Sequence, residues 1–215
     1  MATKASVGLA GAAAGLALGG PLGAVAGAVA PPILELLVLR ENRGIANIAL
    51  LGEIVTELSG LSADEVAAWA REKDGRLHLV TSAMHAAYVT AVNQKISALA
   101  RVLVDNIHDD ALIDCSSLVV AALAQIEAPH IHVLHAMVHE SPPLHPHGVA
   151  VVSGAWCRSQ LAAHLPGLAS GMLAVAATLA ATGMILEGLA AGDDDPAWTV
   201  TSFGVECLRR VESAA

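Results

Sequence analysis

A cluster of histidines provides the first residues in this sequence that could do chemistry. Six of the ten histidines lie between positions 130 and 147. His135 and His139 are four residues apart, so on a helix both imidazoles face the same side and could share a metal ion. His132 or a histidine of the following loop could complete a three-histidine site, with Glu140 nearby. The candidate metal ligands are therefore His132, His135 and His139.

This spacing does not specify a metalloenzyme. In the HExxH motif a glutamate follows the first histidine and acts as general base, whereas here Glu140 follows the second. We therefore expect solvated or hydrogen-bonded histidines on a helix face, with no bound metal and no other cofactor. A pH-sensitive surface is the alternative, because histidine gains its charge at about pH 6.5.

Other catalytic patterns are absent from the sequence. It has no GxxxxGK[ST] phosphate loop and no GxSxG nucleophile elbow, and Ser116 and Ser117 lie in an apolar run. Cys115, Cys157 and Cys207 show no CxxC spacing and are too few for a disulfide framework, which favours a cytoplasmic protein. The sequence predicts that this protein is not an enzyme.

The charge of the chain is concentrated in its second half. The 215 residues carry 11 basic and 20 acidic side chains, a net charge of −9. After position 102 the basic residues are Arg158, Arg209 and Arg210 against 12 acids, which accounts for the whole imbalance. Because negative charge repels phosphate backbones, we expect no nucleic-acid partner.

The N-terminal stretch, residues 5–34, carries no charge at all. Glycine recurs every four residues within it, which on a helix forms one stripe and lets a second backbone approach closely. The glycines of this stripe are Gly11, Gly15, Gly19, Gly23 and Gly27. We expect the segment to self-associate in a homo-oligomer or to perturb the inner membrane.

Two other interpretations of this segment stay open. Gly19-Gly20-Pro21 interrupts any helix, and each half of about 14 residues is too short to cross a bilayer alone. A signal peptide with a cleavage site at Ala28-Val29-Ala30 is one alternative. The other is a glycine- and alanine-rich helical hairpin packed in the protein core.

Helical spacing of apolar residues continues after this segment. Gly44 divides or kinks the first predicted helix, Ser62 and Glu65 form a capping box, and Lys73-Asp74-Gly75 closes the helix that follows. Asp109 and Asp110 are placed to cap a later helix. The predicted helices span residues 33–59, 62–72, 77–107, 111–127, 129–140, 154–164 and 169–181, with a proline-rich loop at 141–147.

The C-terminal residues alternate between helix and strand signals. Short β-prone runs flank an acidic turn at Asp193–Pro196, and Thr201 or Ser202 then caps a last helix. This order predicts a winged-helix-like module with a short β-hairpin. Its acidic turn is unsuited to DNA, so we expect it to contact a protein partner. The predicted organisation is an apolar segment (1–34), a helical body (35–145) and this module (146–215).

Three stretches of the chain resemble the bacterial abortive-infection alpha family of phage-defence proteins. They are APPILELLVLRENR, DDALIDCSSLVVAALAQIEAPHIHVLHAM and GMIL followed by WTVTSFGVECL, and the resemblance covers about residues 30–215. It implies a role in antiviral defence and carries no catalytic residues over to this chain.

Two functions follow from these observations. The first is a non-enzymatic defence or toxicity effector whose glycine-rich N-terminus acts at the inner membrane and is held back by the helical body. The alternative is a soluble, all-helical adaptor that acts through protein contacts, with the N-terminal segment packed in its core.

Overall fold

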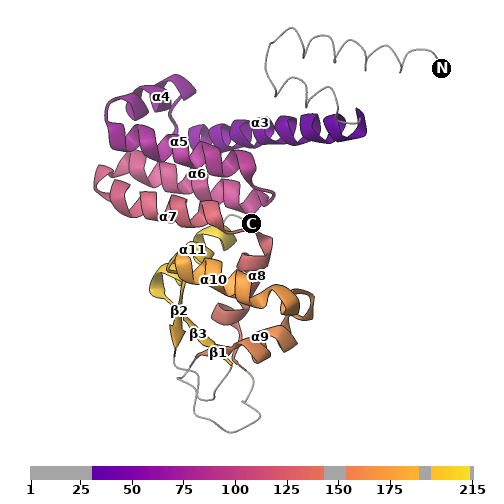
Figure 1. Cartoon of the computed structure of the whole chain (residues 1–215). Coiled ribbons are helices and arrows are strands. Elements are labelled where there is room, and N and C mark those ends of the chain that lie inside the picture. Colours follow the sequence, from indigo (N-terminus) through magenta and orange to yellow (C-terminus); the bar gives the residue numbers. More distant parts are fainter. Residues whose placement is uncertain (1–30, 143–153, 189–194, 214–215) are drawn as a thin grey trace, which may run out of the picture. The chain divides into compact units, whose positions relative to one another are not determined.

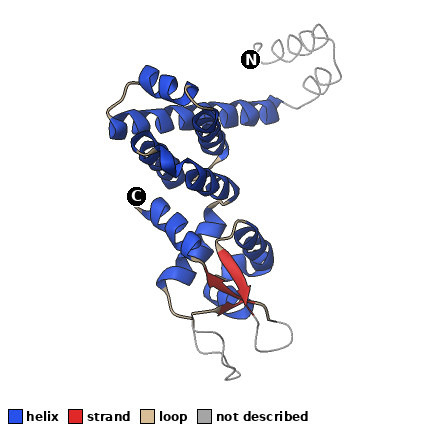
Figure 2. Ribbon diagram, turned by 90° about the vertical axis from the view of Figure 1, so that its left-hand side faces the viewer, coloured by secondary structure: helices blue, strands red, loops and turns tan. Residues whose placement is uncertain are grey.

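The computed structural model describes residues 31–142, 154–188 and 195–213. Within them the chain is mainly helical with one small antiparallel sheet, which confirms the predicted fold class at that level (Figures 1 and 2). The chain divides into two units, residues 1–45 and 46–215.

Several predicted features fall outside the described residues. These are the glycine stripe, most of the proline-rich loop, the domain boundary at residue 145 and half of the acidic turn. In the part that is described, no single helix has both the length and the apolarity to cross a membrane.

The first described helix, α3 (Pro31–Ser59), runs through Gly44, so a division into two helices there is wrong, whereas a kink at Gly44 stays a prediction. A glycine in a helix interior costs about 1 kcal/mol relative to alanine, which a helix of 29 residues tolerates. The helix is followed instead by Gly60, whose φ of 71° favours glycine and whose N–H donates to the Thr56 carbonyl at 3.0 Å.

Helix α4 (Ala63–Arg71) begins with the predicted capping box. The Ser62 hydroxyl accepts from the Glu65 N–H at 3.3 Å, and the Glu65 carboxylate accepts from the Ser62 N–H at 2.8 Å. Two residues after Arg71 comes Lys73, the N-cap of α5 (Asp74–Val89). The Lys73-Asp74-Gly75 sequence therefore marks the start of a helix as well as the end of one.

The predicted helix over residues 77–107 is wrong in extent, because it is broken into α5 and α6 (Asn93–His108). Thr90 is extended, with φ −75° and ψ 150°, and its hydroxyl accepts from the Val92 N–H at 3.1 Å. The Asn47 amide donates to the carbonyls of Ala87 and Thr90 at 3.0 and 3.1 Å. A side chain from α3 thus satisfies carbonyls that a continuing helix would have used.

The next helices follow the prediction more closely. Asp109 caps a short 3₁₀ turn, η1 (Asp110–Leu112), by accepting from the Ala111 N–H at 3.0 Å. Helix α7 (Ile113–Gln125) follows directly, and α8 (Ala128–His139) comes after a two-residue break.

The C-terminal part combines helices with a three-stranded sheet (Figure 1). The strands pair antiparallel in the order β1-β3-β2, with Trp198 of β3 opposite Trp156 on one side and Glu187 on the other. The helix predicted at 154–164 begins only at Arg158, four residues late, because Trp156 and Cys157 form β1. The elements are β1 (Trp156–Cys157), α9 (Arg158–His164), η2 (Pro166–Gly171), α10 (Met172–Ala181), β2 (Ile185–Gly188), β3 (Ala197–Val200) and α11 (Ser202–Glu212).

One hydrophobic cluster links the helices of the body to the C-terminal elements. Its largest fully buried side chains come from both parts. They include Leu79, Ile96, Leu99, Leu123, Leu134, Trp156, Leu161, Met172 and Leu179. Helices α8 and α11 each contribute buried side chains to this cluster, which holds them in place.

Candidate functional site

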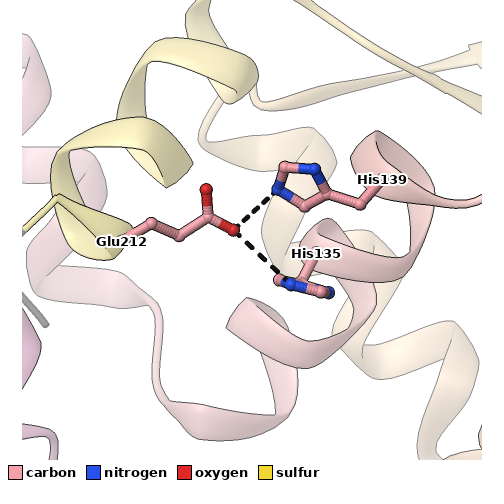
Figure 3. Close-up of side chains that lie close together, drawn as sticks. All are labelled: His135, His139 and Glu212. Atoms are coloured by element: carbon pink, nitrogen blue, oxygen red, sulfur yellow. Dashed lines mark hydrogen bonds and ion pairs between the residues drawn. The ribbon is translucent and has the colours of Figure 1, made fainter.

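Two of the predicted histidines meet a carboxylate from the end of the chain. His135 and His139 lie one turn apart on α8, and Glu212 reaches them from the last turn of α11 (Figure 3). A single carboxylate oxygen, Glu212 Oε1, lies 2.8 Å from His139 Nε2 and 3.6 Å from His135 Nε2. The two imidazole rings are 4.6 Å apart between centroids.

The burial pattern of α8 explains why these rings project outward. Val133, Leu134, Ala136 and Met137 are buried, so the remaining face of the helix is open to solvent. His135 and His139 are 54% and 46% exposed, which leaves their nitrogens accessible to an ion from solution.

Helix α11 is held by its own apolar stripe. Cys207, Leu208 and Val211 are buried at helical spacing, which places Glu212 beside the packed face and next to α8. The Thr201 hydroxyl fixes the start of the helix by accepting from the Gly204 N–H at 2.9 Å. The carboxylate therefore comes from an anchored element.

The other predicted site residues lie elsewhere. His132 is exposed on α8 and is not part of the cluster, and Glu140 instead pairs with His164 Nε2 at 2.8 Å. Glu212 could not be predicted as a member of the site, because 73 positions separate it from His139 and no local pattern connects them.

The cluster offers two imidazoles and one carboxylate to a single point in space. In the part of the chain that the structure describes, it is the one group of this kind with three ligand atoms close enough for a metal ion, all within 4.8 Å of one another. The nearby arginines do not neutralise Glu212 in the contacts observed: Arg209 pairs with Glu206, and Arg210 pairs with Glu206 and Asp105. The arrangement is suited to binding a cation.

A second feature is the uncharged surface of α10. Met172, Val175, Ala176 and Leu179 are buried, while Leu173 is 51% exposed and Ala174 and Ala177 are also exposed. No charged residue occurs between His164 and Glu187. This helix therefore offers solvent an apolar face with no group that attracts phosphate.

His130 has a different role, at the start of α8. Its Nδ1 accepts the N–H of the N-cap residue Glu127 at 3.1 Å, as a glutamine at this position does in a capping box. Burial lowers the pKa of His130 and the nearby Lys95 ammonium lowers it further, although Glu127 opposes this shift. Protonation also removes the lone pair that accepts the hydrogen bond.

We therefore predict an acid-sensitive contribution to stability. The unfolded state binds a proton on His130 more readily than the folded state, so stability is full above about pH 6.5 and falls as the pH drops through that value. His130→Gln keeps the acceptor without titrating, and its unfolding free energy should change less between pH 7.5 and pH 5.5 than that of the wild type. Urea denaturation at both pH values measures this. His132→Gln is the matched control, and equal pH dependence in all three proteins would refute the prediction.

Comparison with protein-family models, with curated proteins and with solved structures finds no match to this chain.

Proposed function

We propose that this chain is a non-enzymatic effector with two working parts, a C-terminal module that contacts protein and an N-terminal segment that self-associates or perturbs the inner membrane. The distribution of charge carries the proposal. Residues 5–34 and 165–186 are uncharged, and all 31 charged side chains lie outside these two stretches. The second stretch contains α10, whose exposed face is apolar.

The C-terminal elements support a winged-helix-like module. From α8 onward the order is helix, strand, two α-helices with the 3₁₀ segment η2 between them, a two-stranded hairpin and a last helix, and the first strand pairs with the third. In winged-helix DNA readers the helix before the hairpin enters the major groove, and α10 holds that place in the chain. This parallel is one of fold alone, and function depends on the side chains that the fold presents.

Those side chains favour protein over nucleic acid. Helix α10 has no basic residue, and all the basic residues after position 102 lie beside carboxylates. Arg158 lies 3.6 Å from Asp195, and Arg210 makes ion pairs at 2.7 and 2.8 Å. A module that releases few counterions has little affinity for DNA, whereas an exposed apolar helix face suits contact with protein.

The membrane part of the proposal rests on sequence and on the start of α3. The glycine repeat is the pattern that allows close helix packing in membranes. Apolar residues continue past it, since Leu36, Val38 and Leu39 are 64%, 55% and 63% exposed. The proposed role in phage defence rests on the resemblance of three sequence stretches to the abortive-infection alpha family.

The adaptor function is the competing proposal, and the exposed face of α10 favours it equally. The adaptor differs from the membrane effector in the role of residues 5–34, because in an adaptor these residues would pack in the core. An adaptor should purify without detergent and should fractionate identically after the glycines are substituted.

The experiment compares two full-length double variants on dye-loaded vesicles of phosphatidylethanolamine and phosphatidylglycerol. Gly15→Leu plus Gly23→Leu places two leucines on the stripe, and Gly8→Leu plus Gly20→Leu places two beside it. Each leucine improves insertion by about 1 kcal/mol, so both variants should bind vesicles at least as well as the wild type. If helices pack through the stripe, only the first variant should lose most of its dye release.

Two results would contradict the membrane part of the proposal. Wild-type protein that neither binds nor permeabilises vesicles would favour the adaptor. Equal dye release by both variants would show that apolarity, and not glycine spacing, drives the activity.

Fluorescence anisotropy with labelled duplex DNA should show no binding at physiological salt, and salt-dependent binding would contradict the protein-contact role of the module.

A further inference from the structure

We propose that His135, His139 and Glu212 form a binding site for a divalent transition-metal ion of the zinc type, which bridges α8 and α11 (Figure 3). The inference is independent of the membrane function, since it concerns only residues of the second unit. It rests on the convergence of three ligand atoms from two helices.

The distances suit such an ion. Zinc binds imidazole nitrogen and carboxylate oxygen at about 2.0–2.2 Å in tetrahedral geometry, which separates neighbouring ligand atoms by about 3.3–3.5 Å. The observed Nε2 to Oε1 distances of 2.8 and 3.6 Å lie on either side of that value. The two imidazole nitrogens lie within 4.8 Å of each other, so a bound ion would draw the ligand side chains together. His139 and Glu212 are exposed enough to move, at 46% and 35%.

The ligand chemistry selects the kind of ion. Two imidazoles with one carboxylate suit Zn²⁺ and its neighbours Co²⁺, Ni²⁺ and Cu²⁺, whereas Ca²⁺ and Mg²⁺ require mainly oxygen ligands. Three protein ligands leave a fourth position of the tetrahedron for water. The helix supplies the two histidines at the i, i+4 spacing that places both rings on one side.

The consequence of binding is structural. A metal held by both helices ties the last turn of α11 to α8, next to the buried Val211. Because the ion binds the folded arrangement and not separated helices, it should raise the thermal midpoint of the chain.

The test uses full-length protein treated with EDTA and then dialysed. ZnCl₂ is titrated in competition with a chromophoric chelator, and thermal unfolding is followed with and without ZnCl₂. We expect the wild type to bind Zn²⁺ and its midpoint to rise. His135→Gln, His139→Gln and Glu212→Gln should each weaken binding at least about tenfold and abolish the rise. His132→Gln, an exposed histidine on the same helix, should leave both unchanged.

A second measurement needs no variant. Co²⁺ added to the wild type should give the intense visible absorption of a four-coordinate nitrogen and oxygen site, and ZnCl₂ should remove it. Absorption from sulfur ligation would place the metal at a cysteine and overturn the proposal. Equal loss of Zn²⁺ affinity in His132→Gln and Glu212→Gln, or an unchanged affinity in Glu212→Gln, would overturn it too. None of these results depends on dye release from vesicles.

Discussion

Lys95→Ala is expected to destabilise the fold by about 3–5 kcal/mol. The side chain is fully buried on α6, and its Nζ donates to the Ile126 carbonyl at 2.7 Å and to Glu127 Oε1 at 2.9 Å. Burial lowers the pKa of Lys95 and Glu127 partly opposes this, so the ammonium is kept at a desolvation cost. Truncation removes the buried alkyl chain and leaves the Ile126 carbonyl without its donor.

Lys95→Met separates the two effects. Methionine fills most of the same space and removes only the polar contacts. Glu127 is 38% exposed and can be hydrated. The expected loss of unfolding free energy is therefore smaller, about 1–3 kcal/mol. Lys73→Ala is the control for an exposed lysine paired with a carboxylate, with an expected change of less than about 1 kcal/mol. Urea unfolding followed by circular dichroism measures all three. A loss in Lys95→Ala no larger than that in Lys73→Ala would show that the buried ion pair contributes nothing.

Gly204→Ala is the second substitution with a large expected effect. A Cβ at this position would lie 2.2 Å from the Met184 carbonyl oxygen and 2.9 Å from its carbon, both backbone atoms that cannot turn away. The first turn of α11 and the residue before β2 must therefore separate. Overpacking of this kind costs about 3 kcal/mol or more.

The separation would also weaken hydrogen bonds at the same junction. The Thr201 N–H donates to the Met184 carbonyl at 3.0 Å, and the Thr201 hydroxyl donates to the Gly183 carbonyl at 2.8 Å and accepts from Gly204. Gly52→Ala is the matched control, because nothing lies within 4 Å of a Cβ there and alanine should stabilise α3 by about 0.5–1 kcal/mol. Equal midpoints for Gly204→Ala and wild type in thermal unfolding would refute the close approach of α11 to Met184.

Local signals in the sequence were sufficient at three helix ends that are made by their own residues. The capping box of Ser62 and Glu65, the cap of Asp109 on η1 and the cap of Thr201 on α11 all act over two or three positions. Such contacts form without the rest of the chain, so a pattern of a few residues predicts them. The mainly helical class followed in the same way from apolar spacing.

Contacts between distant residues decided the features that were predicted wrongly or missed. The break at Thr90 has no glycine or proline to mark it and depends on the Asn47 amide, more than 40 positions away. Strand β1 spans only two residues and exists because β3 pairs with it. In each case the local sequence permits a helix and a partner elsewhere supplies hydrogen bonds that a helix would not.

The candidate site also combines a local feature with one that depends on distant residues. A spacing of four residues places His135 and His139 on one face of a helix, so their relation on the α8 backbone follows from local sequence. Folding of the distant α11 makes Glu212, and not His132, the third member of the cluster. The position of Glu212 depends on the burial of Cys207, Leu208 and Val211, which packs α11 into the core and brings its last turn to α8. Burial depends on the whole folded chain, so a local sequence pattern cannot predict it.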